Sequence, residues 1–123
     1  MTRLVCSALW RLLFYDLLCW MRFSKAYQFV RRCQRAHRSP RANTVDCVVW
    51  AVEEATVWYY KNTYCLQRSA VCTWMLRRHG VAADLIIGFR PLPMDSHAWV
   101  EVDGAIVNDR PQYQKFFRVL DKL

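Results

Sequence analysis

The sequence predicts an α+β fold, with helices in the first two thirds of the chain and a small antiparallel sheet after them. Between residues 3 and 79, apolar side chains recur at the three-and-four spacing of amphipathic helices. From Leu85 onward, short apolar and β-branched runs are separated by proline and glycine turn signals. Helices followed by strands are typical of the α+β class. The 123 residues suit a single domain, 1–123, with a helical N-terminal region over 1–42 and the core over 43–123.

The composition is that of a globular protein, with 54% hydrophobic and 15% aromatic residues, and this excludes a disordered chain. The formal net charge of +8 favours an acidic partner: a peptide, a protein, nucleic acid or a membrane surface. Several cysteines fall on predicted apolar helix faces, and no secretory signal precedes them, so we expect free thiols in the cytoplasm rather than disulfides. No CxxC or HxxxH spacing occurs, so no structural zinc site is expected. The six cysteines are Cys6, Cys19, Cys33, Cys47, Cys65 and Cys72.

The first predicted helix covers Arg3–Arg22 and is apolar around most of its circumference. Arg11 and Asp16 interrupt it, so it is too short and too charged to span a membrane. Asp16 lies outside the polar arc of this helix and therefore needs a partner or an interface edge. The composition favours a helix that packs on the core, with a docking surface for another protein or an in-plane membrane helix as alternatives.

Two further helices are expected between the first helix and Cys65. Ser24–Arg35 lies within residues 22–41, a stretch with seven basic side chains and no acid, which is either a solvated face or a docking site for an acidic partner. The Ser39-Pro40 pair ends that helical region. A third helix begins at Asn43 or Thr44 as N-cap and runs to about Lys61.

The fourth helix is predicted over Cys65–His79, with Gly80 after it in the left-handed conformation that closes many helices. Strands then follow over Leu85–Phe89, Ser96–Val102 and Ala105–Asp109, the first ended by prolines and the last two joined by an Asp-Gly turn. The tail after Pro111 carries no clear pattern.

Cys65 is the candidate nucleophile, because a helix N-terminus favours a thiolate and its free N–H groups can also donate to an oxyanion. Cys72 lies two turns further along the helix, without the terminus, and is expected to be buried and inert. The base must be a histidine. His37 lies in a basic loop, and His79 is about 20 Å away at the far end of the helix. His97, at the start of a strand, is therefore the best candidate.

A third residue should orient the imidazole, and the length of the hairpin loop decides which one is available. With a two-residue loop, paired positions sum to 207, and His97 shares a face with Asn108. With a three-residue loop closed by Gly104, His97 lies directly opposite Asp109. We expect the three-residue loop and Asp109, with Asn108 as the alternative.

Five segments together resemble the transglutaminase-like leader peptidases of lasso-peptide biosynthesis, in that family's order and spacing over about half the chain. The segments are Tyr64–Ala70, Leu76–Val81, Leu85–Gly88, His97–Gly104 and Asn108–Asp109.

The resemblance implies a papain-like, transglutaminase-like core with a triad of Cys65, His97 and Asp109. It implies a cysteine endopeptidase that removes the leader from a ribosomally made lasso-peptide precursor, without a cofactor or a metal. The implied partners are the precursor peptide, a separate leader-recognition protein and an ATP-dependent macrocyclase that acts afterwards, with no nucleic acid. Two alternatives stay open: acyl transfer to an amine by the same triad, and a non-enzymatic basic peptide-binding module.

Overall fold

The computed structural model describes residues 2–21, 28, 42–59, 65–91, 94–109 and 112–123. The order of helices and strands confirms the predicted α+β class. The elements are α1 (Thr2–Met21), α3 (Ala42–Trp58), α4 (Cys65–Arg78), β1 (Ala83–Pro91), β2 (Met94–Val102), β3 (Ala105–Ile106), α5 (Tyr113–Phe116) and β4 (Arg118–Lys122). The helix expected over Ser24–Arg35, the basic stretch around it and His37 lie outside the described residues, apart from Gln28.

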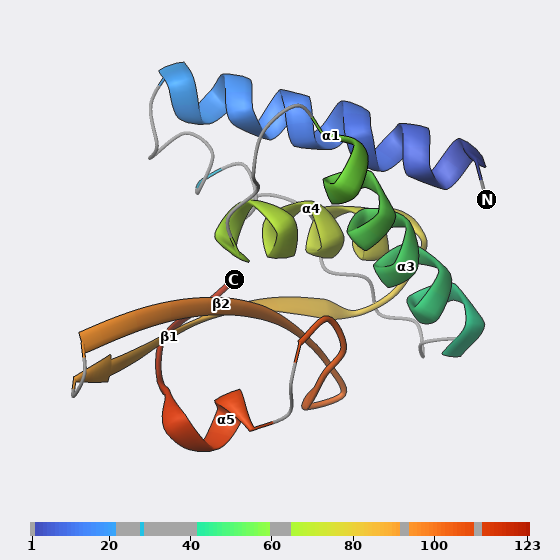
Figure 1. Ribbon diagram of the computed structural model, residues 1–123. Helices are drawn as coiled ribbons and strands as arrows, with labels where there is room; N and C mark the ends of the chain where they lie inside the picture. The colour runs from blue at the N-terminus through green and yellow to red at the C-terminus, as the bar shows by residue number, and fades with distance from the viewer. Residues whose placement is uncertain (1, 22–27, 29–41, 60–64, 92–93, 110–111) are drawn as a thin grey trace.

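The long helices form a layer over one face of the sheet, and α4 is the helix that contacts the strands (Figure 1). The main core lies between them, and its fully buried side chains include Leu12 of α1, Val48 of α3, Leu76 of α4 and Val100 of β2. A smaller apolar cluster of Ile86, Trp99 and Phe117 lies apart from it. Because successive strand residues point to opposite faces, Val100 and Trp99 belong to these two different clusters.

Helix α4 begins at Cys65 and ends as the sequence predicts. Gly80 has a φ of 81°, the left-handed conformation that a side chain would disfavour. Its N–H donates to the Arg77 carbonyl at 3.1 Å, and the Val81 N–H donates to the Leu76 carbonyl at 2.9 Å. This pair of bonds is a Schellman motif, and the burial of Leu76 and Val81 provides its usual apolar contact.

The sheet is antiparallel with the order β3-β2-β1-β4. Strands β1 and β2 are longer than predicted and pair along their length, so that Gly88 lies opposite His97. The tail also contains α5 and a fourth strand, β4, on the free edge of β1. The sequence did not indicate β4 because its residues are almost all exposed and do not alternate.

The turn between β2 and β3 has two residues, so the predicted three-residue loop is wrong. Val102 pairs with Ala105, and the residues between them, Asp103 and Gly104, have φ values of 53° and 79°. A two-residue turn with both φ angles positive matches the right-handed twist of the strands, and aspartate followed by glycine is a preferred sequence for it. This local preference determines the register.

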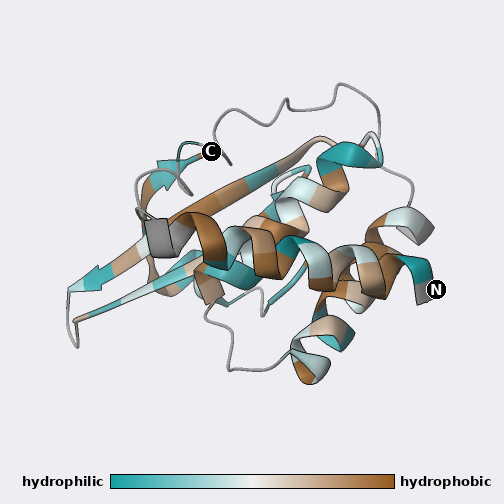
Figure 2. Cartoon of the chain, turned by 90° about the horizontal axis from the view of Figure 1, so that it is seen from above, coloured by the Kyte–Doolittle hydropathy of each residue, from teal (hydrophilic) through white to brown (hydrophobic). Residues whose placement is uncertain are grey.

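Helix α1 is apolar on its outer side as well as its inner side, as Figure 2 shows from above. Trp10, Leu13 and Leu17 are each more than half exposed. Asp16 has the partner that the sequence required, because the hydroxyl of Tyr59, directly after α3, donates to its carboxylate. Within the described residues, no helix is both long and apolar enough to cross a membrane.

Candidate active site

Cys65 is the first residue of α4, and its free thiol is partly exposed. Cys72, two turns along the same helix, is only 1% exposed, as predicted. Burial raises the pKa of the Cys72 thiol to about 12, so this thiol stays protonated and unreactive at neutral pH. The side chain of Gln67 turns away from the sheet and donates to the Leu12 carbonyl of α1. Cys65 is therefore the accessible thiol of α4, held at the end of a helix attached to both α1 and the sheet.

One turn beyond Cys65, Ser69 joins α4 to β2 and to the segment after β3. Its hydroxyl donates to the Ala98 carbonyl at 3.1 Å and accepts a bond from the Asn108 side-chain amide at 3.0 Å. The oxygen of that amide accepts the Val100 N–H at 2.9 Å. Residues four apart lie on one side of a helix, so Cys65 lies on the side of α4 that faces β2. Asn108 is a link between elements, and the expectation that it orients the histidine in a two-residue hairpin is wrong.

Asp109 contacts His97 even though the register argument for it fails. The distance between His97 Nε2 and Asp109 Oδ2 is 2.6 Å, and both side chains are largely buried. Strand β3 ends at Ile106, and the Asn108 side chain takes the ladder position opposite the Val100 N–H. The backbone bends there instead of continuing the strand, and this bend brings Asp109 to the imidazole. With Nε2–H donating to the carboxylate, Nδ1 is the basic nitrogen of the neutral ring.

Three aromatic side chains surround the imidazole, and sequence reasoning missed their role. The ring centroid of His97 lies 4.3 Å from that of Tyr113, 5.9 Å from that of Phe117 and 6.3 Å from that of Trp99. Tyr113 and Phe117 lie on α5 and directly after it, in the tail that carried no pattern; their four-residue spacing was the available signal. These rings restrict the motion of the imidazole.

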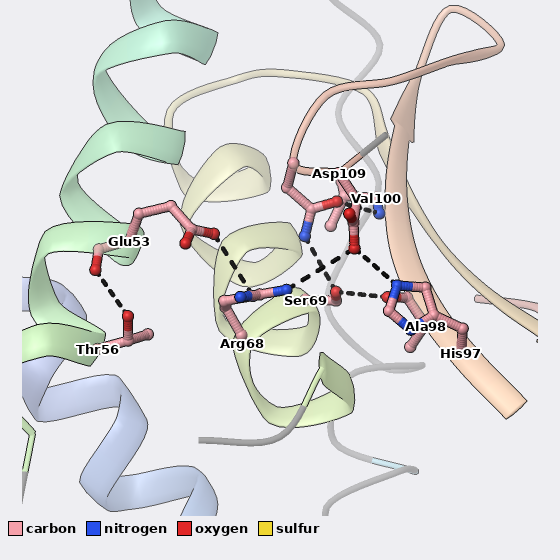
Figure 3. Close-up of polar contacts among 9 residues, drawn as sticks. Glu53, Thr56, Arg68, Ser69, His97, Ala98, Val100 and Asp109 are labelled. Atoms are coloured by element: carbon pink, nitrogen blue, oxygen red, sulfur yellow. Dashed lines mark hydrogen bonds and ion pairs between the residues drawn. The ribbon is translucent and has the colours of Figure 1, made fainter. Parts of the chain in front are cut away.

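A second ion pair reaches Asp109 from the helices. The Arg68 guanidinium of α4 lies 3.7 Å from Asp109 Oδ2 through Nη2 and 3.4 Å from Glu53 Oε1 of α3 through Nε (Figure 3). Burial raises the pKa of Glu53 above its ordinary value, the Arg68 charge lowers it, and the Asp109 charge raises it, with burial the largest effect. Sequence reasoning did not single out either Arg68 or Glu53.

The structure places His97 and Asp109 in direct contact. Cys65 lies one turn before Ser69, whose hydroxyl bonds to the carbonyl of Ala98, the residue after His97. His97 and Trp99 point to one face of the sheet, because side chains alternate along β2. Ala98 points to the opposite face, on which α4 packs. Strand β3 pairs only with Glu101 and Val102, so β2 is the sheet edge at His97. Among the described residues, Cys65 and His97 are not hydrogen-bonded. In the same part of the chain, no group of three or more His, Cys, Asp or Glu side chains could hold a metal ion.

Comparison with known proteins identifies the family of the chain. The model of the transglutaminase-like superfamily matches residues 8–121, which include Cys65, His97 and Asp109. The chain belongs to the transglutaminase-like superfamily. It is also similar to the Microcin J25-processing protein McjB of Escherichia coli, with 36% identity over 59 residues. The match covers 48% of this chain and 28% of that relative, so the chain spans well under two thirds of the relative's length. No solved structure matches the chain significantly.

Proposed function

We propose that the chain is a cysteine endopeptidase that removes the leader from a ribosomally made lasso-peptide precursor, with Cys65, His97 and Asp109 as its catalytic triad. The observation that carries the proposal is the 2.6 Å contact between His97 and Asp109, next to a helix that begins with a partly exposed cysteine. The superfamily membership supports thiol chemistry, and the name of the similar McjB protein states that it processes microcin J25.

The mechanism follows from the position of each group. His97 accepts the Cys65 thiol proton at Nδ1, while Asp109 holds Nε2–H and stabilises the resulting imidazolium. The thiolate sulfur then forms a bond to the scissile carbonyl carbon, and the N–H groups of the first turn of α4 donate to the oxyanion. When this intermediate collapses, the leaving amine takes the proton from Nδ1. Water, deprotonated by His97, then hydrolyses the thioester and restores the thiol.

The proposal includes the partners that the family resemblance implies. The precursor peptide is the substrate, and a separate leader-recognition protein holds its leader. An ATP-dependent macrocyclase uses the new N-terminus afterwards. The reaction takes place in the cytoplasm, and neither nucleic acid nor a cofactor takes part. The net charge of +8 is suited to an acidic peptide or partner.

The test is cleavage of a precursor peptide encoded beside this gene, in the presence of the recognition protein encoded with it, followed by mass spectrometry. We expect the chain to release a core peptide with a free α-amino group and a leader with a free C-terminal carboxyl, whose masses together exceed that of the precursor by one water molecule. Cys65→Ala and His97→Ala proteins should leave the precursor intact. Full cleavage by purified Cys65→Ala protein would exclude Cys65 as the nucleophile. A product linked to an amine would instead indicate acyl transfer, and a precursor that is bound but unchanged would indicate a binding module.

A further inference from the structure

The proposed mechanism gives no role to the Arg68 guanidinium, although it contacts a member of the triad. It lies between two carboxylates from different parts of the fold, Glu53 of α3 and Asp109 after β3. The Asp109 oxygen that Arg68 approaches, Oδ2, is the same atom that accepts from His97 Nε2. Figure 3 shows these four side chains as a continuous series from α3 to β2.

We propose that Arg68 is a positioning residue that aims the Asp109 carboxylate at His97, with Glu53 holding the guanidinium in place. This inference rests on the proposed function, because it assigns Arg68 a role in the same Cys65, His97 and Asp109 site.

The position of Asp109 in the fold supports this role for Arg68. Asp109 follows a strand of only two residues, so the backbone ladder does not fix its position. Its side chain is 15% exposed, and that of Arg68 is 26% exposed, so water screens their interaction only in part. The guanidinium has nitrogens on two sides, so Arg68 pairs with Glu53 through Nε and with Asp109 through Nη2. Both contacts are ion pairs without a hydrogen bond, and an ammonium group has no second nitrogen with which to copy them.

The charges around Asp109 also favour the arrangement. Arg68 of α4, Glu53 of α3 and His97 of β2 face it, and the Tyr113 ring of α5 lies against His97. The Arg68 cation attracts the Asp109 carboxylate, and the same carboxylate faces the ring that becomes an imidazolium at His97. Arg68 alone would also repel that imidazolium. The Glu53 carboxylate offsets this repulsion, and at 3.4 Å from Arg68 Nε it lies on the side away from His97.

The test measures the alkylation rate of Cys65 by iodoacetamide between pH 5 and pH 10, by peptide mass spectrometry. This readout requires no peptide substrate, so it distinguishes failure of this inference from failure of the proposed function. The exposed thiol of Cys6 in the same protein serves as the reference. We expect Arg68→Gln to move the pH midpoint of Cys65 alkylation upward by about one unit, relative to Cys6. Arg78→Gln removes an exposed positive charge from the other end of α4 and should leave the midpoint unchanged.

A double-mutant cycle separates positioning through Asp109 from a direct effect of the Arg68 charge on Cys65. In an Asp109→Ala background, Arg68→Gln should move the midpoint by less than half as much as in the wild type. Equal shifts in both backgrounds, or no shift in the wild type, would overturn the proposal. Arg68→Lys keeps the charge but cannot span both carboxylates, and it should shift the midpoint upward by part of the Arg68→Gln amount. If Arg68→Gln fails to fold, the same cycle is run with Arg68→Lys, and the same two outcomes decide.

Discussion

The first turn and the middle of α4 face the same sheet but differ in their surroundings. Around Cys65 the helix presents polar side chains, and Arg68 and Ser69 make ion pairs and hydrogen bonds to the segment that holds Asp109. Around Cys72 most side chains of the helix are buried, including the apolar Met75 and Leu76. Two cysteines on one helix therefore have different chemistry, because burial raises the pKa of Cys72 to about 12 while Cys65 stays partly exposed.

In the proposed function the first turn of α4 is reactive, and the later turns, from Cys72 onward, are structural. The first turn has free N–H groups and a partly exposed thiol, and the later turns have neither. The following predictions test this division, beginning with the largest expected effect.

Replacing each cysteine by alanine should give opposite results. Cys65→Ala should abolish leader cleavage, because no other accessible thiol lies on α4, and should leave the melting temperature close to that of the wild type. Cys72→Ala should retain cleavage while unfolding more easily, because it leaves a small cavity in the core. Mass spectrometry of the product and thermal unfolding check both. Loss of cleavage in a folded Cys72→Ala protein would contradict the division.

The adjacent residues Asn108 and Asp109 should also separate activity from stability. Asp109→Ala should slow cleavage about 10³- to 10⁴-fold, because the imidazole loses the group that holds Nε2–H. Asn108→Ala should instead lower the free energy of unfolding by about 1 to 3 kcal/mol, because the buried links to Ser69 and the Val100 N–H are lost. Single-turnover cleavage and urea unfolding measure the two effects. A similar loss of rate in both variants would show that the residues act as one unit.

Stability at alkaline pH should depend on Cys72. The unfolded chain loses this proton near its ordinary pKa of 9.0, whereas the folded chain keeps it until about 12. The unfolded state is therefore favoured as pH rises through this window. The free energy of unfolding is unaffected by this group below pH 9 and is lower by about 3 kcal/mol at pH 11. Urea unfolding at pH 8 and pH 11 should show this additional loss in the wild type and in Cys6→Ala, but not in Cys72→Ala. Equal losses in all three proteins would contradict it.

Gly88 should be needed for the aromatic surroundings of His97. A Cβ atom at this position would lie 2.6 Å from the Trp99 ring and 2.8 Å from Phe117. Gly88→Ala should therefore lower the free energy of unfolding by about 1 to 3 kcal/mol and displace rings that contact the imidazole. Gly104→Ala is the matched control, since its Cβ would meet nothing within 4 Å and only its φ of 79° is unfavourable. Gly104→Ala should lower Tm without changing the pH dependence of Cys65 alkylation. Gly88→Ala should lower Tm and also change that pH dependence.

Much of the helical half could be predicted from the sequence, and less of the strand half. The starts and ends of α1 and α4 follow from apolar periodicity and from Gly80, which are local signals. Strand β4 gave no such signal, because its pairing with β1 depends on backbone hydrogen bonds that any exposed sequence can make.

The sequence by itself determined the α+β order and the cysteine at the start of a helix, and it predicted His97 as the base among three histidines. It also predicted that Asp109 lies against His97, a contact that the structure contains, but the register used to select Asp109 was wrong. Tertiary structure alone decided that Asp109 meets His97, because Asn108 leaves the strand ladder and the chain bends. The contacts of Arg68, Glu53, Tyr113 and Phe117 were likewise decided there. Their contacts join elements far apart in the sequence, and only packing brings such elements together.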